Sequence, residues 1–298
     1  MFDRRRFLTR TAGLVAASAL PPAALAAAPL RDPGVKLKLG LNAFSFDEPL
    51  RKGAMTLADI VHFCARNGVD ALDATAYYFP GYPKIPADEA IYGLKRAAFV
   101  NGVAISGTGV RNDFAVPDPA ARKKDLLMVK DWIVAASKLG APVMRVFSGK
   151  DLPAGFSYQQ VFDWMVAHFK ECAAFGRERG VIVALQQHND FLKTAEETIR
   201  LIEAVNSDWF ACVLDIGSLR SADPYAEIEK LVPYAVSWQL KESVYRENKE
   251  EPTDLAKIKA IIDRSGYRGY IPFEALGPGD PEPRIIAFLA QIRKAFAL

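Results

Sequence analysis

The chain has 298 residues, of which 50% are hydrophobic and 24% are charged, as in one large globular domain or two smaller ones. The net charge is only +3, and four arginines in the first ten residues contribute to it, so nucleic-acid binding is not indicated. The three cysteines, Cys64, Cys172 and Cys212, are scattered through apolar segments. We expect them to be small core residues and not a disulfide framework.

The first 26 residues have the pattern of an export signal. Arg5 and Arg6 precede Phe-Leu, which resembles the twin-arginine motif, and a weakly apolar run over residues 12–20 follows. The small residues that end at Ala26 fit a cleavage site, and the apolar run is too short and Ala-rich for a good membrane span. An ordinary secretory signal or an uncleaved anchor is the alternative.

Cleavage after Ala26 would leave a mature chain with the length of one barrel domain. We expect residues 27–34 to be a flexible lead-in and residues 35–298 to form the barrel. No later stretch is long and apolar enough to span a membrane, so we expect no stable membrane span after cleavage.

Short β-branched segments alternate with amphipathic helical patterns along the mature chain. The predicted strands are Leu37–Phe44, Ala71–Ala76, Val103–Val110, Val143–Ser148, Val181–His188, Ala211–Ile216, Val236–Lys241 and Tyr270–Ala275. The predicted helices include Thr56–Asn67, Ala120–Leu139, Tyr158–Arg179, Ala195–Val205, Ala226–Val232, Leu255–Ser265 and Pro283–Phe296. A glycine follows most of these helices, which is typical of a parallel α/β fold. Eight such units favour a single closed (β/α)8 TIM barrel, and there is no nucleotide-binding glycine motif after the first strand.

The segment from Tyr77 to Glu89 follows the second strand and is rich in aromatic residues and proline. In a barrel it would lie at the face where the strands end, which is the catalytic face. We expect it to cover the substrate, with simple packing on the barrel rim as the alternative.

Polar residues end almost every predicted strand. They are Asn42, Ser45, Asp73, Thr108, Arg111, Arg145, Gln186, Gln187, His188, Asn189, Asp190, Asp215, Gln239, Lys241, Glu242 and Glu274. Polar groups flanked by apolar strand residues are costly to bury unpaired. Their convergence on one face therefore predicts a hydrated functional pocket at the carboxyl ends of the strands.

The last four strands carry specific motifs. These are Val183–Asp190, Val213–Ser218, Ser237–Glu242 and Ile271–Leu276. In these segments the chain resembles the xylose isomerase-like TIM barrel family, often called the sugar phosphate isomerases/epimerases. The resemblance implies one metal ligand near the end of each of these strands, in the order Glu, Asp, His and Glu.

Two of those four positions depart from the family pattern. Gln186 replaces the first Glu and Gln239 replaces the His, whereas Asp215 and Glu274 are retained. Such a set offers only oxygen ligands with two negative charges, which favours Mn²⁺ or Mg²⁺ over Zn²⁺. The alternative is a hydrogen-bonded polar cluster without an ion.

The first replacement bears on the reaction. The resemblance implies an acid and a base that are both metal-bound Glu residues, and Gln186 cannot exchange a proton at neutral pH. Glu274 remains the candidate base, and the second group would come from His188 or Lys241. Lys241 is also a candidate to stabilise an enolate, with a salt bridge to Glu242 or Asp215 as the alternative. For His188 the alternative is a structural role.

The remaining candidates are substrate-binding residues. We expect Arg145, Asn42, Asp73 and Gln187 to contact the substrate. Arg145 has the planar donor geometry that holds a sugar oxygen or a carboxylate, although a structural ion pair with Asp73 is an open alternative.

Together these features predict a metal-dependent isomerase or epimerase that takes a proton from the carbon beside a carbonyl of a sugar or keto-sugar. The alternatives are a keto-sugar lyase or hydratase and a non-catalytic periplasmic sugar-binding barrel. We expect a small carbohydrate ligand, no nucleic-acid partner and a periplasmic location. Nuclease chemistry of the kind found on related barrels needs a zinc cluster rich in His, and only His188 ends a strand. The oligomeric state is open, although barrels of this class often form homodimers.

Overall fold

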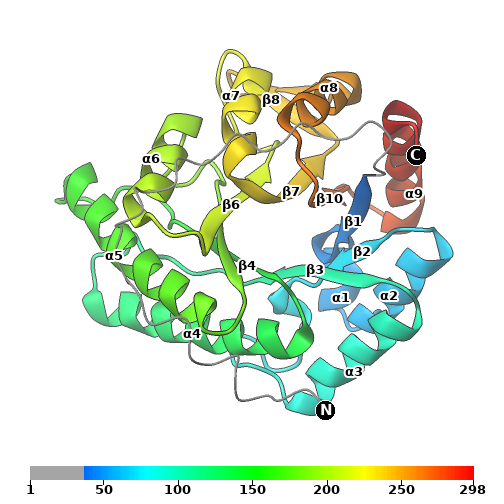
Figure 1. Ribbon diagram of the computed structural model, residues 1–298, viewed down its shortest axis with the longest axis horizontal. Helices are drawn as coiled ribbons and strands as arrows, with labels where there is room; N and C mark the ends of the chain where they lie inside the picture. Colours follow the sequence, from blue (N-terminus) through cyan, green and yellow to red (C-terminus); the bar gives the residue numbers. More distant parts are fainter. Residues whose placement is uncertain (1–36) are drawn as a thin grey trace, which may run out of the picture.

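The computed structural model describes residues 37–298, which form a closed parallel barrel (Figure 1). Its strands are β1 (Lys38–Asn42), β2 (Ala71–Asp73), β3 (Ala104–Gly109), β4 (Val143–Phe147), β5 (Ile182–Gln186), β6 (Phe210–Asp215), β7 (Ala235–Lys241) and β10 (Tyr270–Glu274). They pair in the order β1-β10-β7-β6-β5-β4-β3-β2. This confirms the predicted (β/α)8 barrel. The predicted export signal and lead-in lie outside the described residues.

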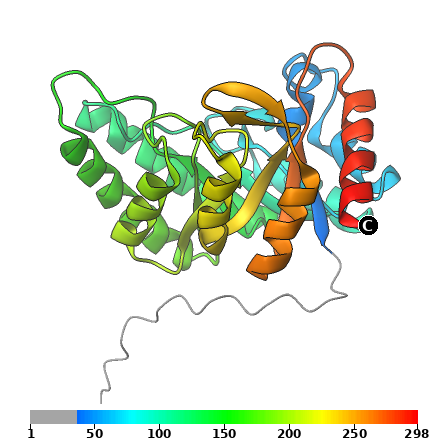
Figure 2. The same cartoon turned by 90° about the horizontal axis from the view of Figure 1, so that it is seen from above.

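The helices surround the barrel (Figures 1 and 2). They are α1 (Asp47–Arg51), α2 (Leu57–Arg66), α3 (Asp88–Val100), α4 (Pro119–Leu139), α5 (Tyr158–Arg177), α6 (Ala195–Val205), α7 (Pro224–Leu231), α8 (Leu255–Ser265) and α9 (Pro281–Phe296). Short 3-10 turns lie at Ala43–Phe46, Ala76–Tyr78 and Val232–Tyr234. No helix of residues 37–298 has both the length and the apolar character that crossing a membrane requires.

Local sequence explains where these helices begin and end. Thr56, Ser157 and Thr194 each form a reciprocal capping box with the residue three positions later. At the other end, Gly140 after α4 and Gly266 after α8 adopt left-handed backbone with φ of 82° and 69°. That conformation stops a helix and suits glycine, so the chain turns directly into the next strand.

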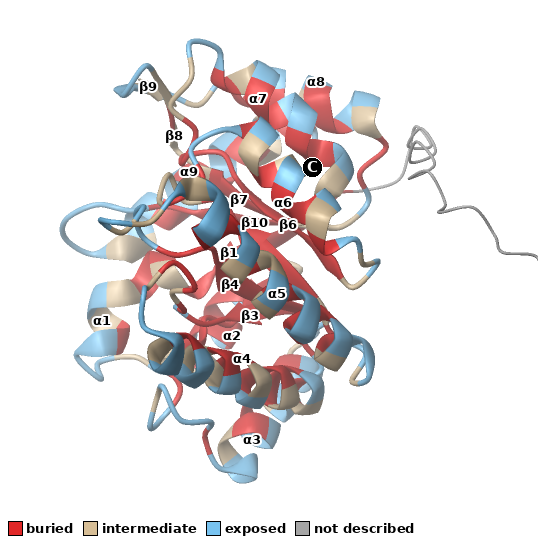
Figure 3. Cartoon of the chain, turned by 90° about the vertical axis from the view of Figure 1, so that its left-hand side faces the viewer, coloured by how far each residue is buried: buried red, intermediate tan, exposed pale blue. Residues whose placement is uncertain are grey.

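The barrel strands and the outer helices differ in how far their residues are buried. The barrel strands are buried along most of their length, whereas the helices expose their outer faces (Figure 3). All three cysteines are buried and free, as predicted. The buried polar residues at strand ends lie at matching heights, because Asn42 pairs in register with Asp73, Asp215 with Gln239, and Glu274 with Lys241. The register therefore brings these side chains to one end of the barrel.

A two-stranded hairpin between β7 and α8 was not expected from the sequence. It consists of β8 (Ser243–Arg246) and β9 (Lys249–Pro252), which pair antiparallel (Figure 2). Its turn places Glu247 and Asn248 in the left-handed region, as a tight hairpin turn requires. The second strand is charged and lacks alternating apolar residues, so the usual strand signal is missing.

Candidate active site

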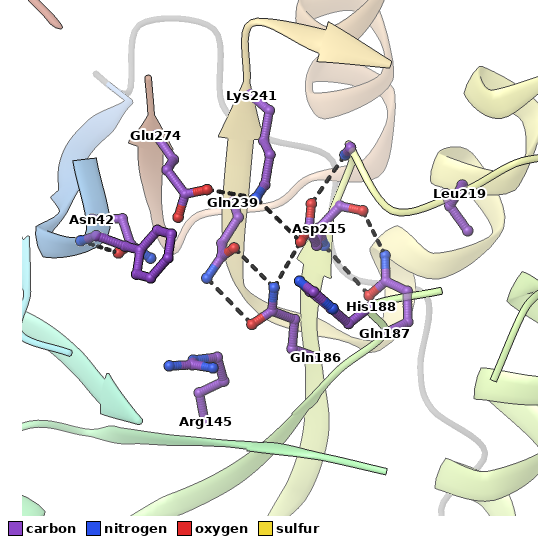
Figure 4. A network of polar contacts seen from close by, with 12 residues as sticks. Asn42, Arg145, Gln186, Gln187, His188, Asp215, Leu219, Gln239, Lys241 and Glu274 are labelled. Atoms are coloured by element: carbon purple, nitrogen blue, oxygen red, sulfur yellow. Dashed lines mark hydrogen bonds and ion pairs between the residues drawn. The ribbon is translucent and has the colours of Figure 1, made fainter. Parts of the chain in front are cut away.

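A pocket of about 460 Å³ opens at the carboxyl ends of the barrel strands. Its lining comes from strand ends and the loops that follow them: Asn42, Phe44, Thr75, Tyr77, Arg111, Arg145, Phe147, Gln186, His188, Gln239, Lys241, Glu274 and Leu276. Figure 4 shows the central polar side chains from β5, β6, β7 and β10 pointing toward one another. The predicted convergence of polar residues is therefore present in the fold.

Gln186 is the centre of a buried hydrogen-bond network. Its Nε2 donates to Asp215 Oδ2 at 2.6 Å and to Gln239 Oε1 at 2.9 Å. The other oxygen of Asp215, Oδ1, accepts from the Gly217 amide at 3.0 Å. An amide thus supplies two donors at the position where the family pattern places a carboxylate.

Lys241 lies between the two carboxylates (Figure 4). Its Nζ is 2.5 Å from Glu274 Oε1 and 3.5 Å from Asp215 Oδ2, and both carboxylates are buried. Burial opposes the charged form of Lys241, but the attraction of Asp215 and Glu274 outweighs it and raises the lysine pKa above its ordinary value. The ammonium is therefore charged at neutral pH. The predicted alternative of a salt bridge to Asp215 is present, and Glu274 is the closer partner.

The four residues predicted to hold Mn²⁺ or Mg²⁺ come together, but their polar atoms satisfy one another. Asp215 accepts from Gln186, which fixes the amide with nitrogen toward the carboxylate. A divalent cation would have to displace the Lys241 ammonium and turn the Gln186 amide against this bond. Within residues 37–298, no group of three or more His, Cys, Asp or Glu side chains is placed to hold a metal. As arranged, these residues do not fit a divalent cation.

Arg145 forms the opposite wall of the pocket. It is buried, its guanidinium donates to the Tyr77 hydroxyl at 3.3 Å, and its charge lies 4.6 Å from the centre of the Phe147 ring. Gly109 on the neighbouring strand makes room for it, because a Cβ there would lie 2.6 Å from Arg145 Nε. The guanidinium is thus held in place by an aromatic face while it lines the cavity.

His188 lies at the edge of the same pocket and is partly exposed. Its ring contacts Phe147 edge-on with centroids 5.3 Å apart, and its Nδ1 is 3.5 Å from Asp190 Oδ2. Nδ1 is buried and makes no hydrogen bond to another described residue. The ring therefore faces the cavity without a strong structural tie.

Three other predicted residues have different surroundings. Asn42 lines the pocket, but its Oδ1 caps the turn after β1 by accepting from the Phe44 amide at 2.8 Å. Gln187 is turned away from the pocket and holds the backbone of Asp215, donating to its carbonyl at 2.8 Å. Asp73 is buried and does not line the pocket. Gln187 is thus a support for β6, and a direct substrate contact by Asp73 is not supported.

Several lining residues were missed or only partly identified from the sequence. Tyr77 belongs to the segment predicted to cover the substrate, and it does line the pocket. Tyr82 of the same segment instead packs on Trp132 with ring centroids 5.8 Å apart, so part of the segment packs against the barrel, and its role in covering the substrate stays a prediction. Phe44, Phe147 and Leu276 are apolar and carry no signal that separates them from core residues.

Comparison with known proteins agrees with the fold. The profile of the xylose isomerase-like TIM barrel family matches residues 61–294. Similar solved structures include D-psicose 3-epimerase with D-tagatose from Clostridium cellulolyticum H10 (TM-score 0.72, 17% identity, covering 87% of this chain and 99% of that chain). Apo 3-keto-D-glucoside 4-epimerase from E. coli gives a TM-score of 0.71 at 13% identity, covering 87% of this chain and 100% of that chain. The IOLI protein with a bound zinc atom gives 0.72 at 14% identity, with 88% and 100% covered. Identities this low show a shared fold, and no curated protein matches the sequence.

Asp73 gives a test of the buried electrostatics. Burial raises its pKa from 3.8 to about 6, with Arg145 opposing and Glu274 adding to the shift. The folded protein thus binds this proton more tightly than the unfolded chain. The contribution of Asp73 to the free energy of unfolding should fall by about 3 kcal/mol as pH rises from about 4 to about 6, and be level above that range.

Chemical denaturation between pH 4 and pH 8 measures this slope. In Asp73→Asn the contribution of the carboxyl is absent, so stability should depend less on pH over the same range. Parallel pH curves for the two proteins would show that Asp73 titrates normally.

Proposed function

The chain belongs to the xylose isomerase-like TIM barrel family, and we propose that it is a sugar isomerase- or epimerase-like enzyme that takes a proton from the carbon beside a carbonyl. Glu274 is the one carboxylate among the described residues that line the pocket, and it touches the Lys241 ammonium. This pairing of a base with a cation is the observation that carries the proposal.

The arrangement gives each group a role in forming an enediolate. Glu274 accepts the proton from the carbon beside the carbonyl, the electron pair of that C–H bond forms the new C=C bond, and the π pair of the C=O bond moves onto the carbonyl oxygen. Lys241 donates a hydrogen bond to this oxygen as its negative charge develops. Arg145, fixed on Phe147, holds a second oxygen of the sugar.

The Lys241 ammonium is proposed to supply the positive charge that a divalent ion would otherwise supply at these strand ends. The support is its contact with both Asp215 and Glu274 and the paired amides of Gln186 and Gln239. The earlier prediction of Mn²⁺ or Mg²⁺ is the competing hypothesis. It requires Lys241 to leave the two carboxylates.

The fate of the enediolate separates two reaction types. An isomerase or epimerase must return the proton at another position or face, and His188 on the rim of the pocket is the candidate for this step. A lyase needs only one base. The amide at Gln186 in place of an acid favours this second candidate, because Gln186 cannot return a proton.

Export to the periplasm is proposed from the twin-arginine pattern of the first residues. Replacing Arg5 and Arg6 together by Lys removes the guanidinium pair of this signal. We expect the precursor then to accumulate in the cytoplasm, as measured by cell fractionation and immunoblotting. Normal export of the double variant would rule out this route.

The proposed chemistry predicts deuterium exchange in D₂O at the carbon beside the carbonyl of a bound keto-sugar, followed by NMR. D-fructose, D-tagatose and D-psicose are suitable probes. Glu274→Gln should slow exchange by about 10²–10⁴-fold while sugar still binds, since the base is lost. Lys241→Met should slow it by about 10²–10³-fold, since the oxyanion loses its donor.

Lys230 provides a matched control. Its ammonium also contacts two carboxylates, Glu196 and Glu227, but on the outer helices. Lys230→Met should leave exchange unchanged. Sugar binding without exchange in the wild-type protein, and unchanged affinity in Glu274→Gln, would instead identify a non-catalytic sugar-binding barrel.

A further inference from the structure

A second pocket of about 670 Å³ adjoins the active-site pocket on the side of the β8–β9 hairpin. The two pockets share four lining residues: His188, Lys241, Glu274 and Leu276. We call the second pocket the hairpin groove. Its own lining includes Ser218 and Arg220 from the loop after β6, and Ser243 and Tyr245 from β8.

The hairpin is fixed over this groove by contacts at both ends. At its tip, the Glu247 amide donates to the Ser221 carbonyl at 3.1 Å, and Arg246 donates to the Ala222 carbonyl. At its base, the Thr253 hydroxyl donates to the Lys241 carbonyl at 2.8 Å. The groove is therefore a formed part of the barrel mouth.

Gly217 keeps the groove open next to Lys241. A Cβ at this position would lie 2.8 Å from Lys241 Cδ, although the backbone there is not in the left-handed region. Glycine is required at position 217 because a side chain would not fit, and not because of the backbone conformation. A larger residue would push the Lys241 side chain away from its place between the two pockets.

The groove has the chemistry that binds a polyhydroxylated ring. The Arg220 guanidinium stacks on the Tyr245 ring at 3.7 Å and is held by its bond to the Gly217 carbonyl at 2.7 Å. Arg284 is fixed by Glu242 at 2.7 Å on the other side. Guanidinium donors, carboxylate acceptors and the hydroxyl of Ser243 together match the hydroxyl groups of a sugar.

The reacting groups lie where the two pockets meet, because Lys241 and Glu274 line both. A sugar unit held against Arg145 occupies only the active-site pocket, since Arg145 does not line the hairpin groove. We propose that the substrate is a glycoside, with its reacting sugar against Arg145 and its second unit in the hairpin groove. This inference rests on the proposed function, and it adds the substrate class.

Isothermal titration calorimetry with D-glucose, D-galactose, maltose, cellobiose and lactose tests the proposal. At least one disaccharide should bind the wild-type protein at least tenfold more tightly than its component monosaccharides. Tyr245→Ala should remove that advantage and leave monosaccharide affinity unchanged, since Tyr245 lines only the groove. Tyr92→Ala, an exposed tyrosine on α3, is the matched control and should change neither affinity.

The outcomes separate this proposal from the proposed function. Monosaccharide binding that Arg145→Ala weakens, with no gain for any disaccharide, overturns the glycoside proposal alone. The same holds if a disaccharide advantage survives Tyr245→Ala. If none of the five sugars binds while the keto-sugars D-fructose, D-tagatose or D-psicose still exchange deuterium, the glycoside proposal falls and the proposed function stands.

Discussion

Two carboxylates, Asp215 and Glu274, are buried at strand ends on either side of β7 and need a positive charge between them. Lys241, which ends β7 itself, provides that charge within the chain. The burial of these charges is tolerable only because the ammonium lies between the two carboxylates and because Asp215 accepts further hydrogen bonds from Gln186 and Gly217. The orientation of Gln186, the shape of the pocket and the choice of base all depend on this ion pair.

The same ion pair links the two parts of the barrel mouth. Gln186 and Gln239 complete the network on the side of the active-site pocket, where an amide can donate to Asp215 and a carboxylate cannot. On the other side, Gly217 leaves room for the stem of Lys241 beside the hairpin groove. The Lys241 ammonium thus lies between the active-site pocket and the hairpin groove, where it can act on a substrate that extends into both.

The barrel itself was predictable because its signals are local. The β-branched runs, the capping residues such as Thr56 and the glycines that end helices each act over a few positions. The register of parallel strands then places residues such as Asp215 and Gln239 at one end without further information.

What the sequence could not supply was the direction of each side chain. Gln187 and Asp73 lie at strand ends as Gln186 does, yet Gln187 donates to the backbone of Asp215 and Asp73 is buried without lining the pocket. The β8–β9 hairpin was missed because Lys249–Pro252 has no apolar alternation, and it is stabilised by contacts with the distant loop after β6.

Calorimetric titration with Mn²⁺ tests the central claim most directly, because it needs no knowledge of the substrate. If Lys241 supplies the positive charge of the site, the wild-type protein should give no saturable Mn²⁺ binding. The variant Gln186→Glu/Gln239→His/Lys241→Met, which restores the ligand types of the family and removes the ammonium, should bind about one equivalent. Binding of one equivalent by the wild-type protein, lost in Asp215→Ala, would contradict the account and place a metal ion at these strand ends.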